Sequence, residues 1–151
     1  MSKLKTVRYG FEDGKATYVY RYKHNEFLGE AICHEDDKDF ESSMVGLELA
    51  ENRAYLQYLK VRRDELLVRY ETLKGFYNLI SADRNFDVAS SYATKMRNEI
   101  AYVYAELQDC RNGVRAIPKM LDERIKGRED LYQKLRKKRK EAAVTTEEKG
   151  E

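Results

Sequence analysis

The chain has 151 residues and a formal net charge of only +2, although 37% of its residues are charged. This length allows one domain with a sizeable core, and the 42% of hydrophobic residues exclude global disorder. No segment approaches the roughly 20 consecutive apolar residues that cross a bilayer, and the N-terminal residues lack the apolar stretch of a signal peptide. Because only two cysteines occur, we expect a reduced, cytoplasmic protein that does not contact a membrane.

The first forty residues predict a three-stranded antiparallel sheet. Val7–Phe11 and Ala16–Tyr22 flank the dipeptide Asp13-Gly14, which strongly favours a two-residue hairpin turn. A polar turn at residues 23–26 then leads to a third short strand, Phe27–Cys33.

Alternation along the second strand places four side chains on one face of the sheet, namely Ala16, Tyr18, Tyr20 and Tyr22. Tyrosines on a sheet can stack on nucleic-acid bases. The helix that follows needs a sheet to cover, however, so we expect this face to belong to the core. Tyr102 and Tyr104, on a later helix, are better candidates for an exposed contact patch.

The acidic segment after the third strand holds the densest group of metal-capable side chains. One hypothesis has His34 bind a divalent ion together with neighbouring carboxylates, which are Asp36, Asp37 and Asp39. The interpretation that we favour is a turn whose carboxylates interact with the positive N-terminus of the next helix. Cys33 and His34 point to opposite faces of a strand and do not predict a nucleophile pair. We therefore expect no enzymatic activity, no metal and no cofactor.

A long helix is predicted from about Ser43 to Ser81, with Ser42 or Ser43 as its N-cap. Its seam, at alternating three- and four-residue steps, comprises Val45, Leu49, Asn52, Leu56, Leu59, Arg63, Leu66, Tyr70, Leu73, Tyr77 and Ile80. The two polar members, Asn52 and Arg63, are expected to fix the register of helix pairing. A second apolar face in the N-terminal half predicts packing on the sheet, whereas the Leu59–Ile80 half pairs with another helix.

A second helix is predicted from near Phe86, with Asp87 as its cap. The short polar link at residues 81–85 implies an antiparallel hairpin. The seam of this helix continues without a gap through Ala89, Ala93, Met96, Ile100, Val103, Leu107, Cys110, Val114, Ile117 and Leu121.

Gly113 and Pro118 fall inside this seam. A glycine after an asparagine is typical of a helix end, and a proline is typical of the first turn of a new helix. We therefore predict a break between residues 112 and 118, in preference to a kink. A third helix would run from Pro118 to about Ala143, before a disordered tail at residues 144–151.

Basic residues concentrate in one segment. Residues 111–140 carry twelve Lys and Arg against four Asp and Glu, a net charge of +8. The run Lys134–Lys140 (KLRKKRK) can contact nucleic-acid phosphates, or it can form a solvated helix end or face an acidic protein. We favour a solvated helix end or a contact with an acidic protein over contact with nucleic acid.

The first helix has no length left to meet the seam beyond residue 113, so the end of the seam and the basic segment form the candidate partner-binding set. This set comprises Val114, Ile117, Leu121, Arg124, Arg128, Lys134, Arg136, Lys137, Lys138 and Arg139.

Residues 29–54 combine a strand that ends in Cys33-His34, an acidic turn and a helix that opens with Gly46 and Ala50. This arrangement resembles a pattern in small uncharacterised phage and prophage proteins. In that pattern a strand ending in Cys-His leads through an acidic turn to a helix that opens Gly-x3-Ala-x2-Arg-Ala. This chain matches it with Cys33, His34, Gly46, Ala50, Arg53 and Ala54, although the segment between Cys33 and Gly46 is longer. The resemblance implies a phage origin, hence the cytoplasm of a host cell, and a sheet-plus-helix module. It implies no activity.

These patterns together predict an α+β protein that is mainly helical. Residues 1–58 form the sheet and the start of the first helix, and residues 59–143 form a coiled-coil-like hairpin with a break near 112–118 and a basic C-terminal helix. We expect a non-enzymatic protein that binds or occludes a host or phage protein, as an inhibitor or assembly factor, or that self-associates through its helices. The alternative function is nucleic-acid binding through residues 118–140.

Overall fold

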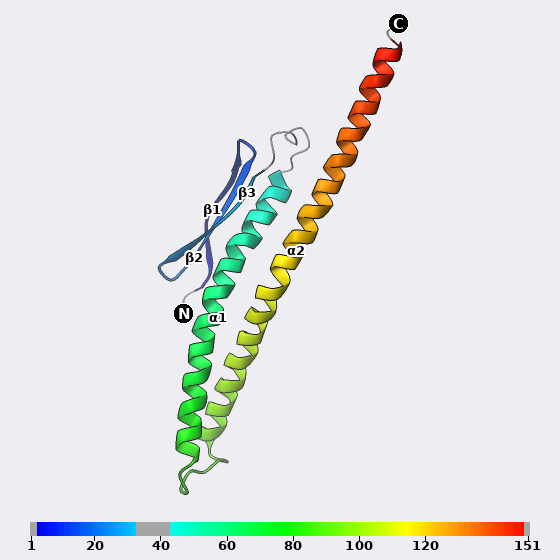
Figure 1. The fold of residues 1–151 in the computed structure, drawn as a ribbon. Coiled ribbons are helices and arrows are strands. Elements are labelled where there is room, and N and C mark those ends of the chain that lie inside the picture. Colours follow the sequence, from blue (N-terminus) through cyan, green and yellow to red (C-terminus); the bar gives the residue numbers. More distant parts are fainter. Residues whose placement is uncertain (1–2, 33–42, 150–151) are drawn as a thin grey trace. The chain divides into compact units, whose positions relative to one another are not determined.

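The computed structural model describes residues 3–32 and 43–149 (Figure 1). A three-stranded antiparallel sheet precedes two long helices, and 71% of the described residues are helical, so the predicted α+β fold is confirmed. The chain divides into two compact units, one made of residues 1–54 with 117–151 and the other of residues 55–116. No helix within the described ranges is long and apolar enough to cross a membrane.

The sheet contains β1 (Lys5–Glu12), β2 (Lys15–Tyr22) and β3 (Asn25–Ile32) in that spatial order. Asp13 and Gly14 form the first turn with φ values of 51° and 75°. Both central residues of a type I′ turn require positive φ, and an Asp-Gly pair adopts it at low cost. The predicted hairpin is therefore confirmed. Cys33, which was expected to end the third strand, lies outside the described residues.

Helix α1 (Ser43–Ser81) packs on the sheet within the first unit, as predicted for its N-terminal half. A Cβ atom added to Gly29 of β3 would lie 1.8 Å from the carbonyl oxygen of Ala50. Strand and helix backbones thus approach more closely than any side chain at residue 29 allows. Buried alanines, Ala16, Ala31 and Ala50, fill the space beside this contact.

The tyrosine face of β2 belongs to this core, as expected. Tyr22 is buried, and Tyr18 packs against the alanine cluster. The Tyr20 hydroxyl donates a 2.6 Å hydrogen bond to the Glu51 carboxylate of α1. The pKa of Tyr20 is raised above its usual value, mainly by burial and next by this hydrogen bond. Tyr20 therefore ties the sheet to α1.

The second unit is an antiparallel helical hairpin made by the remainder of α1 and the first part of α2 (Ser91–Lys149). Its seam is fully buried at Leu66, Val103 and Leu107. A Cβ atom on Gly113 would lie 2.7 Å from Cδ1 of Leu59. Gly113 therefore leaves room for a leucine of the opposite helix.

The predicted break between residues 112 and 118 is wrong, because α2 is one helix with Pro118 in its interior. Proline removes one helical hydrogen bond and costs about 3 kcal/mol in a helix interior. Seam residues that are at least half-buried lie on both sides of the proline, at Val114, Ile117 and Leu121. We infer that this continuous packing outweighs the local cost, since tertiary contacts supply most helical stability.

Both predicted ends of the second helix also need correction. Ser90, not Asp87, caps α2, because its Oγ accepts a 3.1 Å hydrogen bond from the Ala93 amide. Asp87 caps a preceding turn by accepting from the Ala89 amide. At the other end, α2 continues to Lys149, so residues 144–149 are helical rather than a disordered tail.

Candidate partner-binding surfaces

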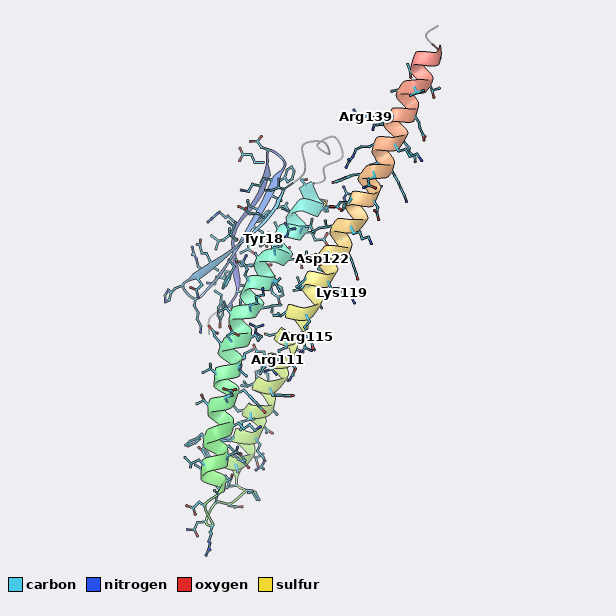
Figure 2. The ribbon with its side chains drawn as sticks, in the orientation of Figure 1. Tyr18, Arg111, Arg115, Lys119, Asp122 and Arg139 are labelled. Carbon is cyan, nitrogen blue, oxygen red and sulfur yellow. The ribbon has the colours of Figure 1, made fainter. Side chains whose placement is uncertain are left out.

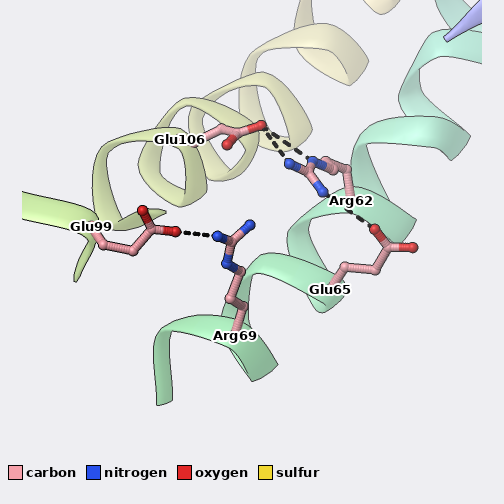
Figure 3. Close-up of polar contacts among 5 residues, drawn as sticks. All are labelled: Arg62, Glu65, Arg69, Glu99 and Glu106. Atoms are coloured by element: carbon pink, nitrogen blue, oxygen red, sulfur yellow. Dashed lines mark hydrogen bonds and ion pairs between the residues drawn. The ribbon is translucent and has the colours of Figure 1, made fainter. Parts of the chain in front are cut away.

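Ion pairs connect the two helices of the hairpin (Figure 3). Arg62 donates from Nε and Nη2 to Glu106 Oε1, at 3.2 and 2.8 Å. Two turns further along α1, Arg69 pairs with Glu99, which lies seven residues before Glu106 on α2. Each pair joins α1 to α2, so together they hold the antiparallel register.

The sequence assigned this register role to Asn52 and Arg63, and that prediction is wrong. Asn52 Nδ2 donates to the carbonyl oxygen of Glu48 on its own helix. Arg63 Nε donates to its neighbour Asp64. Sequence analysis missed Arg62 and Arg69 because they lie beside the apolar seam, where spacing alone does not reveal which opposite charge each will meet.

The same side of the hairpin becomes aromatic near the loop. Phe76 lies seven residues after Arg69 on α1, and Tyr92 lies seven residues before Glu99 on α2. Residues spaced by seven share one side of a coiled coil. A third pair of positions in this repeat therefore carries rings in place of charges.

The loop end of the hairpin, which we call the hairpin tip, carries four exposed apolar side chains. They are 48% to 74% exposed, and comprise Phe76, Leu79, Val88 and Tyr92. They lie in the last turns of α1, in the connecting loop and in the first turn of α2. The heptad spacing did not predict these residues, because they lie off the apolar seam. The signal that could have found them is the presence of apolar residues off the seam next to a predicted loop.

Arg97 holds the loop of the hairpin tip in place. Its Nη1 donates to the Tyr77 hydroxyl at 2.9 Å and to the carbonyl oxygen of Val88 at 2.7 Å. The ring of Tyr77 also packs edge-on against Phe86, with 5.9 Å between centroids. Val88 thus stands on a preformed loop, and the other three exposed side chains stand on helices, which reduces the entropy lost on binding.

The predicted seam residues of the partner-binding set lie along α2, where Val114 and Ile117 are half-buried and Leu121 is only 6% exposed. The expectation that α1 leaves this seam uncovered needs correction. Arg124 Nη2 donates to Glu48 Oε2 at 2.5 Å, so α1 still runs opposite α2 at residue 124. We therefore leave these three apolar residues out of the proposed contact surface.

The basic members of the set divide by exposure. The guanidinium of Arg128 lies 4.8 Å from the centroid of the Tyr132 ring, and Arg136 is half-buried. The other five are exposed, namely Arg124, Lys134, Lys137, Lys138 and Arg139. Figure 2 shows Arg139 far along α2 from Arg111, Arg115 and Lys119, which succeed one another along an earlier part of the helix.

The metal-binding and thiol groups considered in the sequence lie at residues 33–39 and at Cys110. Cys33, His34 and the carboxylates of residues 35–39 lie outside the described residues. Among the described residues, no three His, Cys, Asp or Glu side chains group in a way that could hold a metal ion. Cys110 is a buried thiol, and burial raises its pKa above the usual value.

Comparison with protein-family models, with curated protein sequences and with solved structures found no similar protein.

Proposed function

We propose that this protein is a non-enzymatic binding protein whose hairpin tip inserts into an apolar groove of another protein. The observation that carries the proposal is the presence of four exposed apolar side chains at the hairpin tip, on the helix ends and on the loop that Arg97 contacts. Exposed apolar clusters on soluble proteins mark interaction sites. A preformed convex tip is suited to a concave partner.

The size of the hairpin tip favours a different protein over a second copy as the occupant. Four large side chains at this exposure offer roughly 400 Å² per molecule, so two tips face to face would bury roughly 800 Å². Stable interfaces bury at least about 1,200 Å². A groove that surrounds the tip buries its flanks as well and reaches that area.

The resemblance of residues 29–54 to small phage and prophage proteins gives this proposal its setting. The partner would be a host or phage protein, and the effect would be to occlude it or to assist assembly. The ion pairs of Arg62 and Arg69 keep the two helices of the hairpin in register toward the tip.

Affinity capture with matched variants tests the proposal. The double variant Phe76→Gln/Leu79→Gln removes two apolar side chains of the hairpin tip. Tyr9→Gln/Ile32→Gln is the control, because Ile32 and Leu79 have nearly equal exposure, 73% and 74%, and Ile32 lies on the sheet. We expect the tip variant to capture at least tenfold less partner from host lysate than the unmodified chain does. The control should capture the same amount as the unmodified chain.

Two outcomes would contradict the proposal. Equal capture by both variants would show that the hairpin tip is not the contact. A concentration-dependent doubling of solution mass that the tip variant abolishes would make a second copy the occupant instead.

A further inference from the structure

The basic run of α2 does not lie at a helix end. Lysine side chains stabilise a helix C-terminus only within its last turn. The helix continues to Lys149, so Lys134–Lys140 lies more than two turns before the end. Compensation of the helix dipole, which the sequence allowed as an explanation of this run, therefore does not account for it.

The segment that follows Arg136 is exposed on all sides. Every residue from 137 to 146 is exposed. Glu48 pairs with Arg124 and α1 begins at Ser43, so α2 beyond about residue 129 has no α1 residue opposite it. This part of α2 therefore extends beyond the start of α1.

Positive charge surrounds this helix. Consecutive residues are separated by about 100° around a helix axis, so Lys137, Lys138, Arg139 and Lys140 point to four different sides. Like charges three and four residues apart, as at Lys134, Lys137 and Lys138, disfavour the helix by a few tenths of a kcal/mol per pair. A polyanion that surrounds the helix would remove this repulsion.

We propose that the Lys134–Lys140 segment of α2 binds the major groove of double-stranded DNA. A helix is about 10–12 Å wide with its side chains, and the B-form major groove is about 12 Å wide, with phosphates along both edges. This arrangement suits a helix that is basic on every side. DNA binding is independent of the proposed function, because it concerns the C-terminal part of α2 and not the hairpin tip.

Other anionic partners fit the segment less well. A membrane surface binds helices that have one apolar face, and residues 137–140 are basic on every side. A protein surface contacts one side of a helix and would leave the other lysines unused. The major groove of duplex RNA is deep and narrow and does not admit a helix.

Titration of the full chain with a fluorescent DNA duplex of about 20 base pairs tests the proposal. We expect micromolar binding at about 50 mM salt, and a slope of log K against log salt of about −3 to −4, because each contacted phosphate contributes about −0.9. An RNA duplex of the same sequence should bind at least fivefold more weakly.

Matched lysine variants localise the contact. Lys134→Gln/Lys137→Gln/Lys138→Gln should weaken DNA binding at least tenfold and bring the slope close to −1. The control removes the same charge from the hairpin, at Lys60, Lys74 and Lys95, and should change affinity less than twofold. Circular dichroism of both variants checks that the helices remain.

The proposal is overturned if no DNA binding occurs at low salt, or if both triple variants weaken it equally. Equal affinity for the RNA duplex would overturn insertion into the major groove. Competition by polyglutamate or by anionic lipid vesicles as effective as that of unlabelled DNA, at equal charge, would assign the segment to an acidic protein or to a membrane instead.

Discussion

Arg69 on α1 pairs with Glu99 on α2, seven residues in each helix from the pair of Arg62 with Glu106. The hairpin therefore repeats one ionic register, and the next positions of the repeat hold Phe76 and Tyr92. The ion pairs that set the helix register and the exposed rings of the hairpin tip therefore occupy successive positions of one heptad repeat.

The Arg62–Glu106 pair should contribute modestly to stability. Both side chains are partly exposed, so we expect Glu106→Gln to lower the free energy of unfolding by about 0.5–1 kcal/mol in urea titration. The control is Asp64→Asn, whose partner Arg63 is the next residue on the same helix, and a smaller change is expected there. The difference should shrink in about 1 M salt. Equal losses in the two variants would contradict a register role for the cross-helix pair.

Gly29 should tolerate no side chain. Gly29→Ala places a Cβ atom against the backbone of Ala50, which is not a flexible group, and we expect a loss of more than about 3 kcal/mol of unfolding free energy. Gly75→Ala is the matched control, since nothing lies within 4 Å of the added atom. That variant should gain about 0.5–1 kcal/mol from helix propensity. Similar effects at both glycines would rule out close packing of β3 on α1.

Replacing Pro118 should increase the stability of the protein. In a continuous helix, Pro118→Ala restores one backbone hydrogen bond, so we expect an increase of about 1–3 kcal/mol in unfolding free energy together with unchanged or higher helical circular dichroism. If a new helix instead began at this proline, the substitution would bring little gain, because proline suits a first helical turn.

Tyr20 should make stability depend on pH in alkali. The hydroxyl titrates near pH 10 in the unfolded chain, and its pKa is raised in the folded protein. Its contribution is therefore complete below about pH 10 and is lost as the pH rises above that value, because the unfolded chain releases the proton more readily. Tyr20→Phe should flatten the alkaline decline in melting temperature. Parallel pH profiles for the two proteins would contradict this role.

The sequence could predict most of the fold because its strongest signals are periodic and local. Asp13-Gly14 determines its turn through positive φ, and the seam of α1 reproduced the observed bounds Ser43–Ser81. Gly113 and Pro118 misled because their local preference for helix ends is real. What overrides it, the packing of Leu59 on Gly113 and the burial of Leu121, depends on residues distant in sequence.

The candidate surfaces were harder to predict for a related reason. Charge clustering identified the lysines of α2, since exposure of charged side chains is the rule. Val114 and Leu121 were taken as contact residues because the reach of α1 was underestimated, and only the pair of Glu48 with Arg124 reveals that reach. The hairpin tip depends on which apolar residues stay uncovered, and spacing along one helix does not report that.

Site-specific photocrosslinking from the hairpin tip tests the central claim most directly. A photoreactive phenylalanine analogue would replace Leu79 in the full chain, and Tyr9 of β1, which is also well exposed, in a control chain. We predict that position 79 crosslinks one partner protein in host lysate and that position 9 does not. Crosslinking of the same protein from both positions with equal yield, or crosslinks only between copies of this chain, would contradict the account.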